Sequence, residues 1–587
     1  MFNPNSAIDR IKNSLSYKLG LAIIEHKKQY KEWGYIVLLY KLYKIKQQYK
    51  KEQKLYKQTI KIFPHLAYPK VEFCKDYNES IKYKYHLSYM LGETLICAHK
   101  TWYKGGYFKL PSLLKEKYKL YKNIQDIISI LPQNLHYHFY NSTIKNHKIN
   151  IQSLVYILKQ HKDYNPILEN IFHNFDFFIK HFDLINTWLL SNDFKEKYKQ
   201  ENHPYPSLLD PKKLNDDNEK INYKNIPAEL AWEMNLPLPD RYKFVLFTFG
   251  LTGHSVLLRA LVYHGVKLQW YSNDYKKLYL DHFKYSYDCI HVLFLNTNDF
   301  RKSLKYINLF PKIVTIFLIR DPISKFKTGL NHGGYKKGCG NYDIINHNIP
   351  IEQIIDRVKY PFLEQITIGH MLNFWLNNGI WYYDTILKNI YTDKIYFLDM
   401  EDLMPDKIIS TFANLKLEFK LNSVDNLEQI QKMVFGPYRY ILPIIIKFSF
   451  KEYMNINVYI ELKDRMTNGN IILNNMFRYS HVLLQDISFS VLKSDFKKLN
   501  DKLIEKIDSF QKIFLDVLYN KIRYIQNKKW SEENILSELL NNKSMRKKIF
   551  NMLNQELNFI KKYHPDIIAS WKYYQEFEKM CKELDGD

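Results

Sequence analysis

A strand, a glycine-containing turn and the start of a helix follow one another between Lys243 and Gly265. The stretch KFVLFTF is a continuous apolar run that ends at Gly250, the pattern of a buried strand. Gly253 permits a tight turn, and SVLLRALVYHG then carries apolar residues at helical spacing. Because main-chain N–H groups gather at such a helix N-terminus, the arrangement can bind an anion. An ordinary strand-to-helix turn of an α/β domain explains the same pattern, and both interpretations stay open at this point.

Four residues of this turn are candidate binding residues: Gly250, Thr252, Gly253 and Ser255. The two glycines loosen the backbone for the turn, and the two hydroxyl groups add to its main-chain N–H donors. The turn lacks the Gly-Lys-Ser/Thr ending of a Walker A motif.

The chain of 587 residues is strongly basic, because 86 Lys and Arg residues exceed 61 Asp and Glu residues by 25. A basic chain can bind nucleic acid, an anionic membrane surface or a phosphate-bearing substrate. The excess is mostly lysine, spread from end to end, without an Arg-rich tract or a recognisable nucleic-acid-binding module. We therefore place nucleic acid last and expect no nucleic-acid partner.

Cysteine usage and the N-terminal segment bear on the compartment. The five cysteines are scattered and form no CxxC pair, which favours a reducing compartment and argues against a zinc site or a disulfide framework. The segment MFNPNSAIDRIKNS lacks the apolar core of a signal peptide, and no apolar run is as long as a membrane span. We expect a cytoplasmic protein with no metal site, and peripheral association with the inner membrane stays open.

A repeat occurs near the N-terminus, where LSYKLG begins at Leu15 and LSYMLG at Leu87, an offset of 72 residues. Gly34 and Gly106 match at the same offset. Each copy predicts a helix, a short turn at the second glycine and a helix rich in Lys and Tyr. Two copies are too few for a solenoid, so we expect a helical module whose lysine-rich faces are solvated or dock onto an anionic membrane or a polymeric acceptor.

Changes in pattern divide the chain into five regions. We predict a helical tandem-repeat module over residues 1–125 and a helical region over 126–200. The Pro-, Asp- and Asn-rich residues 201–240 are expected to be a linker or an extended covering segment. An α/β domain over 241–425 follows, in which CIHVLFL, KIVTIFLI and KIYFLD are further buried strands separated by helices. Residues 426–587 are expected to form a helical extension. Alternating strands and helices imply a mostly parallel sheet with ligands at the carboxyl ends of its strands.

A second motif directly follows the strand KIVTIFLI and consists of Arg320, Asp321 and Pro322, with Thr328 eight residues after the arginine. An arginine at a strand end can place a planar, permanently charged set of donors against a phosphate. Asp-Pro ends the strand, and a helix can begin there with proline in its first turn. Thr328 then lies about two turns along this helix, where its hydroxyl could reach the same anion.

With these motifs in order, residues 241–420 resemble the sulfotransferase superfamily. There a Gly-containing loop after the first strand holds the donor's 5′-phosphates, and an Arg-Asp-Pro motif with Ser or Thr eight residues on holds the nucleotide's 3′-phosphate. The segment YFLDMEDLMPDKIISTFANL is similar to the superfamily's strand, Glu-Asp-Leu and helix. The resemblance implies a sulfotransferase-like parallel sheet flanked by helices, with a 3′-phosphonucleotide donor. The matching residues are Thr252, Gly253, His254, Ser255, Arg320 and Thr328.

Two positions depart from that superfamily. Many sulfotransferases carry a lysine in the first loop, where this chain has Leu251, and a catalytic histidine, where it has Asn296, Asn298 and Asp299. His254 could instead act as the acid for the leaving group or stabilise its charge, and Asp299 could take the proton of the acceptor hydroxyl. Both residues also have a structural interpretation, His254 as a loop residue that caps the helix and Asp299 as a helix N-cap.

The segment GLNHGGYKKG follows the second motif. It could fold over the donor with Lys336 and Lys337, or it could be a surface loop.

The whole chain also resembles a narrower family, the large epsilonproteobacterial capsule-locus proteins that are called sugar transferases. The residues that carry this resemblance are the two repeat segments, KTWYKGGY at 100–107 and IPAELAWEMNLPLP at 226–239. Such proteins carry the repeats before an uncharacterised C-terminal domain, and some are associated with adding O-methyl phosphoramidate groups to capsule sugars. The donor in that pathway is a cytidine diphosphoramidate with a 3′-phosphate, which a sulfotransferase-like site would suit.

The two resemblances together imply a capsule-modifying transferase that moves a phosphoramidate group from a 3′-phosphonucleotide to a sugar hydroxyl. The acceptor would be capsular polysaccharide or its sugar precursor. Capsule assembly proteins, the inner-membrane surface and Mg²⁺ stay open as further partners or cofactors. The alternatives are a sulfotransferase that uses 3′-phosphoadenylyl sulfate, a capsule glycosyltransferase and a non-enzymatic capsule-assembly protein. The glycosyltransferase is less favoured because no strand end carries an Asp-x-Asp metal motif.

Overall fold

The structure is a computed structural model that describes residues 3–29, 34–141, 151–294, 297–311, 314–377, 381, 383–390, 394–423, 438, 441–450, 454–463 and 466–586. For residues 35, 297–299, 389, 450 and 454 only the backbone is described. The chain divides into two compact units, residues 1–239 and 240–587, which we treat separately.

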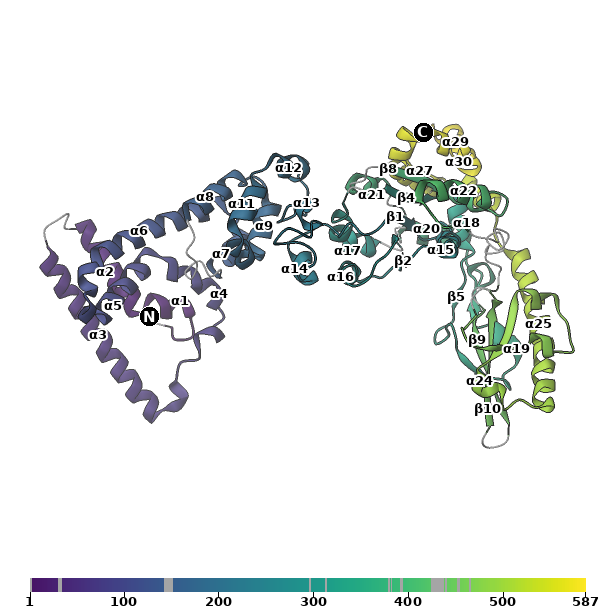
Figure 1. The fold of residues 1–587 in the computed structure, drawn as a ribbon, viewed down its shortest axis with the longest axis horizontal. Coiled ribbons are helices and arrows are strands. Elements are labelled where there is room, and N and C mark those ends of the chain that lie inside the picture. The colour runs from purple at the N-terminus through teal and green to yellow at the C-terminus, as the bar shows by residue number, and fades with distance from the viewer. Residues whose placement is uncertain are drawn as a thin grey trace. The chain divides into compact units, whose positions relative to one another are not determined.

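The sequence repeat forms two packed helical hairpins in the first unit (Figure 1). Helices α2 (Leu15–Gln29) and α3 (Tyr35–Ile62) belong to the first copy, and α5 (Leu87–Lys100) and α6 (Gly106–Ile130) belong to the second. Helices α2 and α5 touch at equivalent glycines: a Cβ on Gly20 would lie 1.6 Å from the Ser88 carbonyl oxygen, and a Cβ on Gly92 would lie 1.8 Å from that of Ser16. The repeat therefore places glycine where the two helix backbones are in contact.

Residues 201–239, expected as a linker or an extended covering segment, are packed into the first unit. The Tyr164 hydroxyl donates to the His203 carbonyl over 2.7 Å, and Asn170 Nδ2 donates to the carbonyls of Pro206 and Met234 over 2.8 and 2.9 Å. The side chains of Leu208, Leu209, Leu236 and Leu238 are buried. A segment rich in Pro and Asn lacks helical or strand periodicity, but side chains of the preceding helices satisfy its main-chain carbonyls.

A five-stranded parallel sheet forms the centre of the second unit (Figure 1). The strand order is β2-β3-β1-β4-β8. Every residue of β1 and β3 is buried, as expected for strands covered on both faces. The strands are β1 (Phe244–Phe249), β2 (Leu268–Gln269), β3 (Cys289–Phe294), β4 (Val314–Ile319) and β8 (Lys394–Asp399).

Helices cover both faces of this sheet. Helices α15 (His254–Tyr263) and α22 (Ile408–Phe419) share one apolar cluster with the strands. On the other face, aromatic contacts join the strands to α17 (Thr297–Asn308) and α21 (Tyr383–Asn389), for example Phe294 with Phe300 and Phe249 with Tyr383. The predicted α/β class is therefore confirmed at the level of a parallel sheet flanked by helices.

A second sheet lies mostly within the region that was expected to be a helical extension. Its order is β11-β12-β10-β9-β6, and it is antiparallel except for the β6–β9 pair. The strands are β6 (Ile344–Asn346), β9 (Ile444–Phe450), β10 (Met454–Leu462), β11 (Ile471–Ile472) and β12 (Ile487–Val491). Four of the five lie between residues 426 and 587, so this region, predicted to be largely helical, also contains strands. Most of that region is still helical. The long helix α25 (Asp501–Lys528) contributes much of the helical pattern that the sequence shows there.

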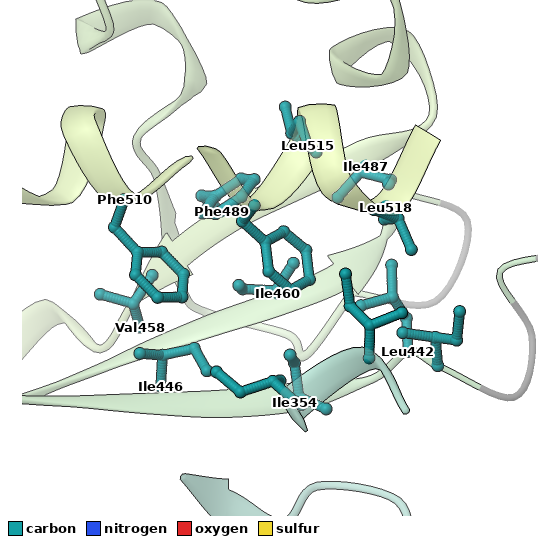
Figure 2. Packing of buried hydrophobic residues seen from close by; sticks show 14 of the residues in the cluster. Ile354, Leu442, Ile446, Val458, Ile460, Ile487, Phe489, Phe510, Leu515 and Leu518 are labelled. Carbon is teal, nitrogen blue, oxygen red and sulfur yellow. The ribbon is translucent and has the colours of Figure 1, made fainter. Parts of the chain in front are cut away.

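The core of this mixed sheet is apolar (Figure 2). Ile446, Val458 and Phe489 from three strands pack with Phe510 and Leu518 of α25. All five side chains have at most 9% exposure, so the core excludes water. Strand β6 comes from a segment between two helices of the parallel-sheet region and ties that segment to this core.

Candidate functional site at the edge of the parallel sheet

The strand order creates a topological switch point between β1 and β4. The chain leaves β1 toward β2 on one side, and it leaves β4 toward β8 on the other. In open α/β sheets, ligands bind outside the carboxyl ends of two adjacent strands whose connections leave toward opposite sides of the sheet. The turn Gly250–Gly253 follows β1, and Arg320 follows β4, so both sequence motifs lie at this switch point.

The turn after β1 has a constrained backbone. Leu251 and Gly253 have φ angles of 70° and 82°, and Gly253 is the N-cap of α15. A Cβ at Gly253 would lie 2.0 Å from the Met400 sulfur, in the turn after β8. Glycine is therefore required at Gly253 by its left-handed backbone and by the close approach of Met400.

The predicted polar donors of the turn differ in position. Thr252 is completely buried, and its hydroxyl donates to the Phe249 carbonyl over 2.7 Å. His254 and Ser255 are half-buried in the first turn of α15 and line a cavity of about 380 Å³. The structure thus places Ser255 and His254 at an accessible surface, while the Thr252 hydroxyl holds the turn to the end of β1.

Arg320 links the two motifs directly. Its Nη1 donates to the Leu251 carbonyl oxygen over 3.2 Å, so the end of β4 is bonded to the turn after β1. Burial lowers the pKa of this guanidinium, and four carboxylates oppose the shift: those of Glu532, Asp399, Asp321 and Glu401. Arginine stays charged under such conditions, so a cation lies beside the turn.

Helix α18 (Pro322–Leu330) brings the rest of the second motif to the same place. Asp321 caps it, with its Oδ1 accepting from the main-chain N–H of Ile323 over 2.8 Å. The Thr328 hydroxyl is half-buried and donates to the Ser324 carbonyl over 3.1 Å. A Cβ on the next residue, Gly329, would lie 2.8 Å from Leu251 Cδ1, so α18 packs closely on the turn.

Two further predictions have different outcomes. Asp299 lies in α17, directly beyond the end of β3, but its side chain is outside the described part of the chain, as is Asn296. The role of Asp299 therefore stays a prediction. Lys336 and Lys337 are exposed, and the main-chain N–H of Lys336 donates to the Arg357 carbonyl over 2.9 Å beside the pair of short strands β5 (Gly334–Tyr335) and β7 (Val358–Lys359). Tyr335 packs on the core of the mixed sheet.

The C-terminal helices contact the second motif, which the sequence did not predict. The second carboxylate oxygen of Asp321 accepts from the main-chain N–H groups of Tyr573 and Tyr574 over 3.1 and 3.2 Å, at the start of α30 (Lys572–Asp585). Asp321 therefore caps two helices at once. The Trp571 indole N–H donates to Asp399, which ends β8.

Glu532, the first residue of α26 (Glu532–Asn541), accepts from the Ser324 hydroxyl over 2.8 Å and from Lys327 over 2.6 Å. Serine and acidic residues at 531–533 are a recognisable helix start in the sequence. The partners on α18 are about two hundred residues away, and no local pattern identifies them.

A buried lysine lies behind the site. Lys325 has no exposed surface, its Nζ donates to the Tyr383 hydroxyl over 3.3 Å, and it lies 4.2 Å from the centroid of the Trp381 ring. Burial holds the pKa of Lys325 well below its ordinary value. Burial also raises the pKa of Glu556 from 4.5 to about 7, helped by Asp384 and opposed by Lys325.

Two family models match parts of the chain. Residues 2–123 are similar to a domain of unknown function (DUF8374), and residues 397–584 to a protein of unknown function (DUF2972). The first match includes α2, α3, α5 and most of α6, and the second runs from the end of β8 into α30. Neither match reaches the Gly250–Gly253 turn or Arg320. No curated protein and no solved structure matches the chain.

The described residues include no group of three or more His, Cys, Asp or Glu side chains placed to hold a metal ion. In the same ranges, no helix has both the length and the apolar character needed to cross a membrane.

Proposed function

We propose that the chain is a transferase that binds a 3′-phosphonucleotide at the switch point and passes its terminal phosphoramidate group to a sugar hydroxyl. The hydrogen bond from Arg320 to Leu251 is the observation that carries this proposal. It joins the Gly-containing turn to the Arg-Asp-Pro motif, the two segments that resemble the phosphate-binding motifs of sulfotransferases.

The proposed donor would lie across the ends of β1 and β4. Its 5′-phosphates would face the N-terminus of α15, where main-chain N–H groups and the Ser255 hydroxyl are the donors. Its 3′-phosphate would face Arg320 and Thr328. A fixed arginine and a helix N-terminus can supply most of the catalysis, because phosphoryl-type transfer depends mainly on positioning and charge neutralisation.

The transfer step is an in-line displacement at phosphorus. The sugar oxygen forms the new O–P bond while the bond from that phosphorus to the bridging oxygen of the nucleotide breaks. The hydroxyl proton passes to a base, for which Asp299 is the candidate, and the nucleotide 3′,5′-bisphosphate leaves. His254 is the candidate to stabilise the charge on the leaving phosphate.

The choice of phosphoramidate over sulfuryl rests on Leu251 and on the resemblance to capsule-locus proteins. Leu251 stands where many sulfotransferases carry a lysine, and its side chain contacts α18 beside Gly329. A different first loop suits a different transferred group. The corresponding acceptor would be capsular polysaccharide or its sugar precursor, handled at the cytoplasmic side of the inner membrane.

Calorimetric titration with nucleotides tests this proposal. Cytidine and adenosine 5′-phosphates would be compared with their 3′,5′-bisphosphates, and a nucleotide-sugar would serve as the control ligand. We expect the 3′-phosphate to strengthen binding at least about tenfold, and Arg320→Ala to remove that gain, since hydrogen bonds to charged groups contribute about 1.5–3 kcal/mol. Preference for cytidine supports phosphoramidate, and preference for adenosine supports sulfuryl transfer. Equal binding with and without the 3′-phosphate would overturn the proposal.

A further inference from the structure

A cavity of about 380 Å³ lies on the side of the Gly250–Gly253 turn that faces away from β4. Its lining comes from the start of α15, from β3 and from the two residues that follow β2. His254 and Ser255 contribute to it, so the cavity opens beside the N-terminus of α15. Its volume lies within the range of about 300–1,000 Å³ that is usual for small-molecule sites.

Trp270 forms a broad aromatic surface at this cavity. Trp270 is 61% exposed, although it directly follows a strand of the central sheet. The side chain of Gln269 anchors that strand, because its Nε2 donates to the Leu278 carbonyl over 2.7 Å and its Oε1 accepts from the Tyr306 hydroxyl over 2.8 Å. The backbone that carries Trp270 is therefore fixed before any ligand arrives.

His291 is a buried polar group of the cavity lining. It lies on β3 with 2% exposure, and its Nε2 is 2.8 Å from the Thr248 hydroxyl. Among the described residues, its Nδ1 has no hydrogen-bond partner. Burial, together with the neighbouring His254, lowers the pKa of His291 to about 3, so the imidazole is neutral at physiological pH. A neutral imidazole can donate a hydrogen bond to a ligand hydroxyl or accept one from it.

The order of the strands determines the order of the candidate binding residues along the carboxyl edge of the sheet. Along the carboxyl edge, Arg320 follows β4, the Gly250–Gly253 turn follows β1, and Trp270 follows β2 beyond β3. If Arg320 binds the 3′-phosphate of the nucleotide and the N-terminus of α15 binds its 5′-phosphates, the cavity is left for the second substrate. The transferable group then lies between the two ligands, beside His254.

We infer that this cavity binds a sugar ring of the acceptor, with one face of the sugar stacked on Trp270 and a hydroxyl bonded to His291. An exposed indole suits the apolar C–H face of a sugar, and the neutral imidazole suits its hydroxyl groups. This assignment rests on the proposed function, since it gives the acceptor of that transfer a place.

Saturation-transfer NMR on the full chain with cytidine 3′,5′-bisphosphate present tests the assignment. The probes are the methyl glycosides of glucose, galactose, mannose, N-acetylglucosamine and N-acetylgalactosamine. We expect at least one to bind, and Trp270→Ala to weaken it at least tenfold, while Trp270→Phe retains affinity within about threefold because it keeps an aromatic face. Tyr285→Ala removes another exposed aromatic residue, 59% exposed and outside the cavity lining, and is expected to change nothing.

Three results would overturn the sugar site: no glycoside binds the wild type, Trp270→Ala binds glycosides as well as the wild type, or Trp270→Ala loses the nucleotide instead of the glycoside. The last result would assign the cavity to the nucleotide base. The outcome is separable from the proposed donor. Loss of 3′-phosphate dependence in calorimetry would contradict the donor proposal, whether or not glycoside binding depends on Trp270.

Discussion

The two five-stranded sheets of the second unit differ in what their edges can do. In the parallel sheet every strand ends at the same edge, so Arg320, Asp399 and the Gly250–Gly253 turn meet there although they are far apart in the chain. In the mixed sheet all neighbouring strands except β6 and β9 run in opposite directions, and its apolar face is covered by α25. Strand direction, more than residue type, therefore decides where polar side chains from distant segments can converge into a site.

Two arginines, one beside each sheet, differ in the same way. Arg357, beside the mixed sheet, donates from Nη1 to Asp343 over 3.0 Å and from Nη2 to the Ile441 carbonyl over 3.2 Å. It neutralises a carboxylate within the fold. Arg320 donates to the carbonyl of a turn at a helix N-terminus, where an anionic ligand would also lie. We therefore expect loss of a core side chain of the mixed sheet to lower stability without changing nucleotide binding, and loss of Arg320 to weaken nucleotide binding.

The largest expected effect is on the mixed sheet. Phe489 is completely buried in its core (Figure 2), so Phe489→Ala should lower the free energy of unfolding by about 3–5 kcal/mol. Urea denaturation measures this loss. Calorimetry on the folded fraction should give an unchanged nucleotide affinity, and a tenfold loss of affinity would break the contrast between the sheets.

A pH-dependent effect is expected behind the parallel-sheet site. The pKa of Glu556 is raised from 4.5 to about 7, so the folded state holds its proton more tightly than the unfolded state. Folding stability should then fall as pH rises from about 4.5 to about 7, by at most about 3 kcal/mol. Glu556→Gln removes this cost and should stabilise the protein at pH 8 but hardly at pH 4.5.

Thermal denaturation at the two pH values, with Glu538→Gln as a control carboxylate of the neighbouring helix, measures the difference. Equal effects of Glu556→Gln at both pH values would show that Glu556 is not protonated in the folded protein.

Gly253 should be more sensitive than a matched glycine of the mixed sheet region. Both Gly253 and Gly469 have left-handed backbones, with φ of 82° and 88°, but a Cβ at Gly469 would meet nothing within 4 Å. Gly469→Ala should cost about 1 kcal/mol from backbone strain alone. Gly253→Ala should cost about 2 kcal/mol, because Met400 must also move. Urea denaturation compares them, and Met400→Ala should relieve part of the Gly253→Ala cost.

The smallest effect is expected from exchanging the cation. Arg320→Lys keeps the charge but loses the planar set of donors, so affinity for a nucleotide 3′,5′-bisphosphate should fall about tenfold. Arg357→Lys should lower stability and leave that affinity unchanged. Equal losses of affinity in the two variants, measured by calorimetry, would mean that Arg320 acts only through the fold.

Local patterns in the sequence predicted the strands and turns of the parallel sheet well. The apolar run before Gly250 is β1, and the Asp-Pro of the second motif starts α18 with Asp321 as its cap. Both follow from neighbouring residues. The bond from Arg320 to Leu251 joins residues 69 positions apart and depends on the strand order, which no local pattern contains.

Other features depend on long-range packing, which the sequence did not reveal. Thr252 has the right residue type for an anion ligand, but its hydroxyl is bonded inside the turn. The cap that Asp321 provides for α30 joins residues more than 250 positions apart. Strands β9 and β10 precede the long helices of the C-terminal region, and the pairing that makes them a sheet includes β6 from a distant segment.

The most direct test of the central claim is amide hydrogen exchange of the full chain with and without cytidine 3′,5′-bisphosphate. The account predicts slower exchange in peptides from the Gly250–Gly253 turn, the start of α15 and the region from Arg320 to Thr328, with no change in β9, β10 and β12 of the mixed sheet. Protection confined to the mixed sheet, or none at the ligand concentration that saturates calorimetric binding, would contradict the claim that the parallel-sheet edge holds the donor.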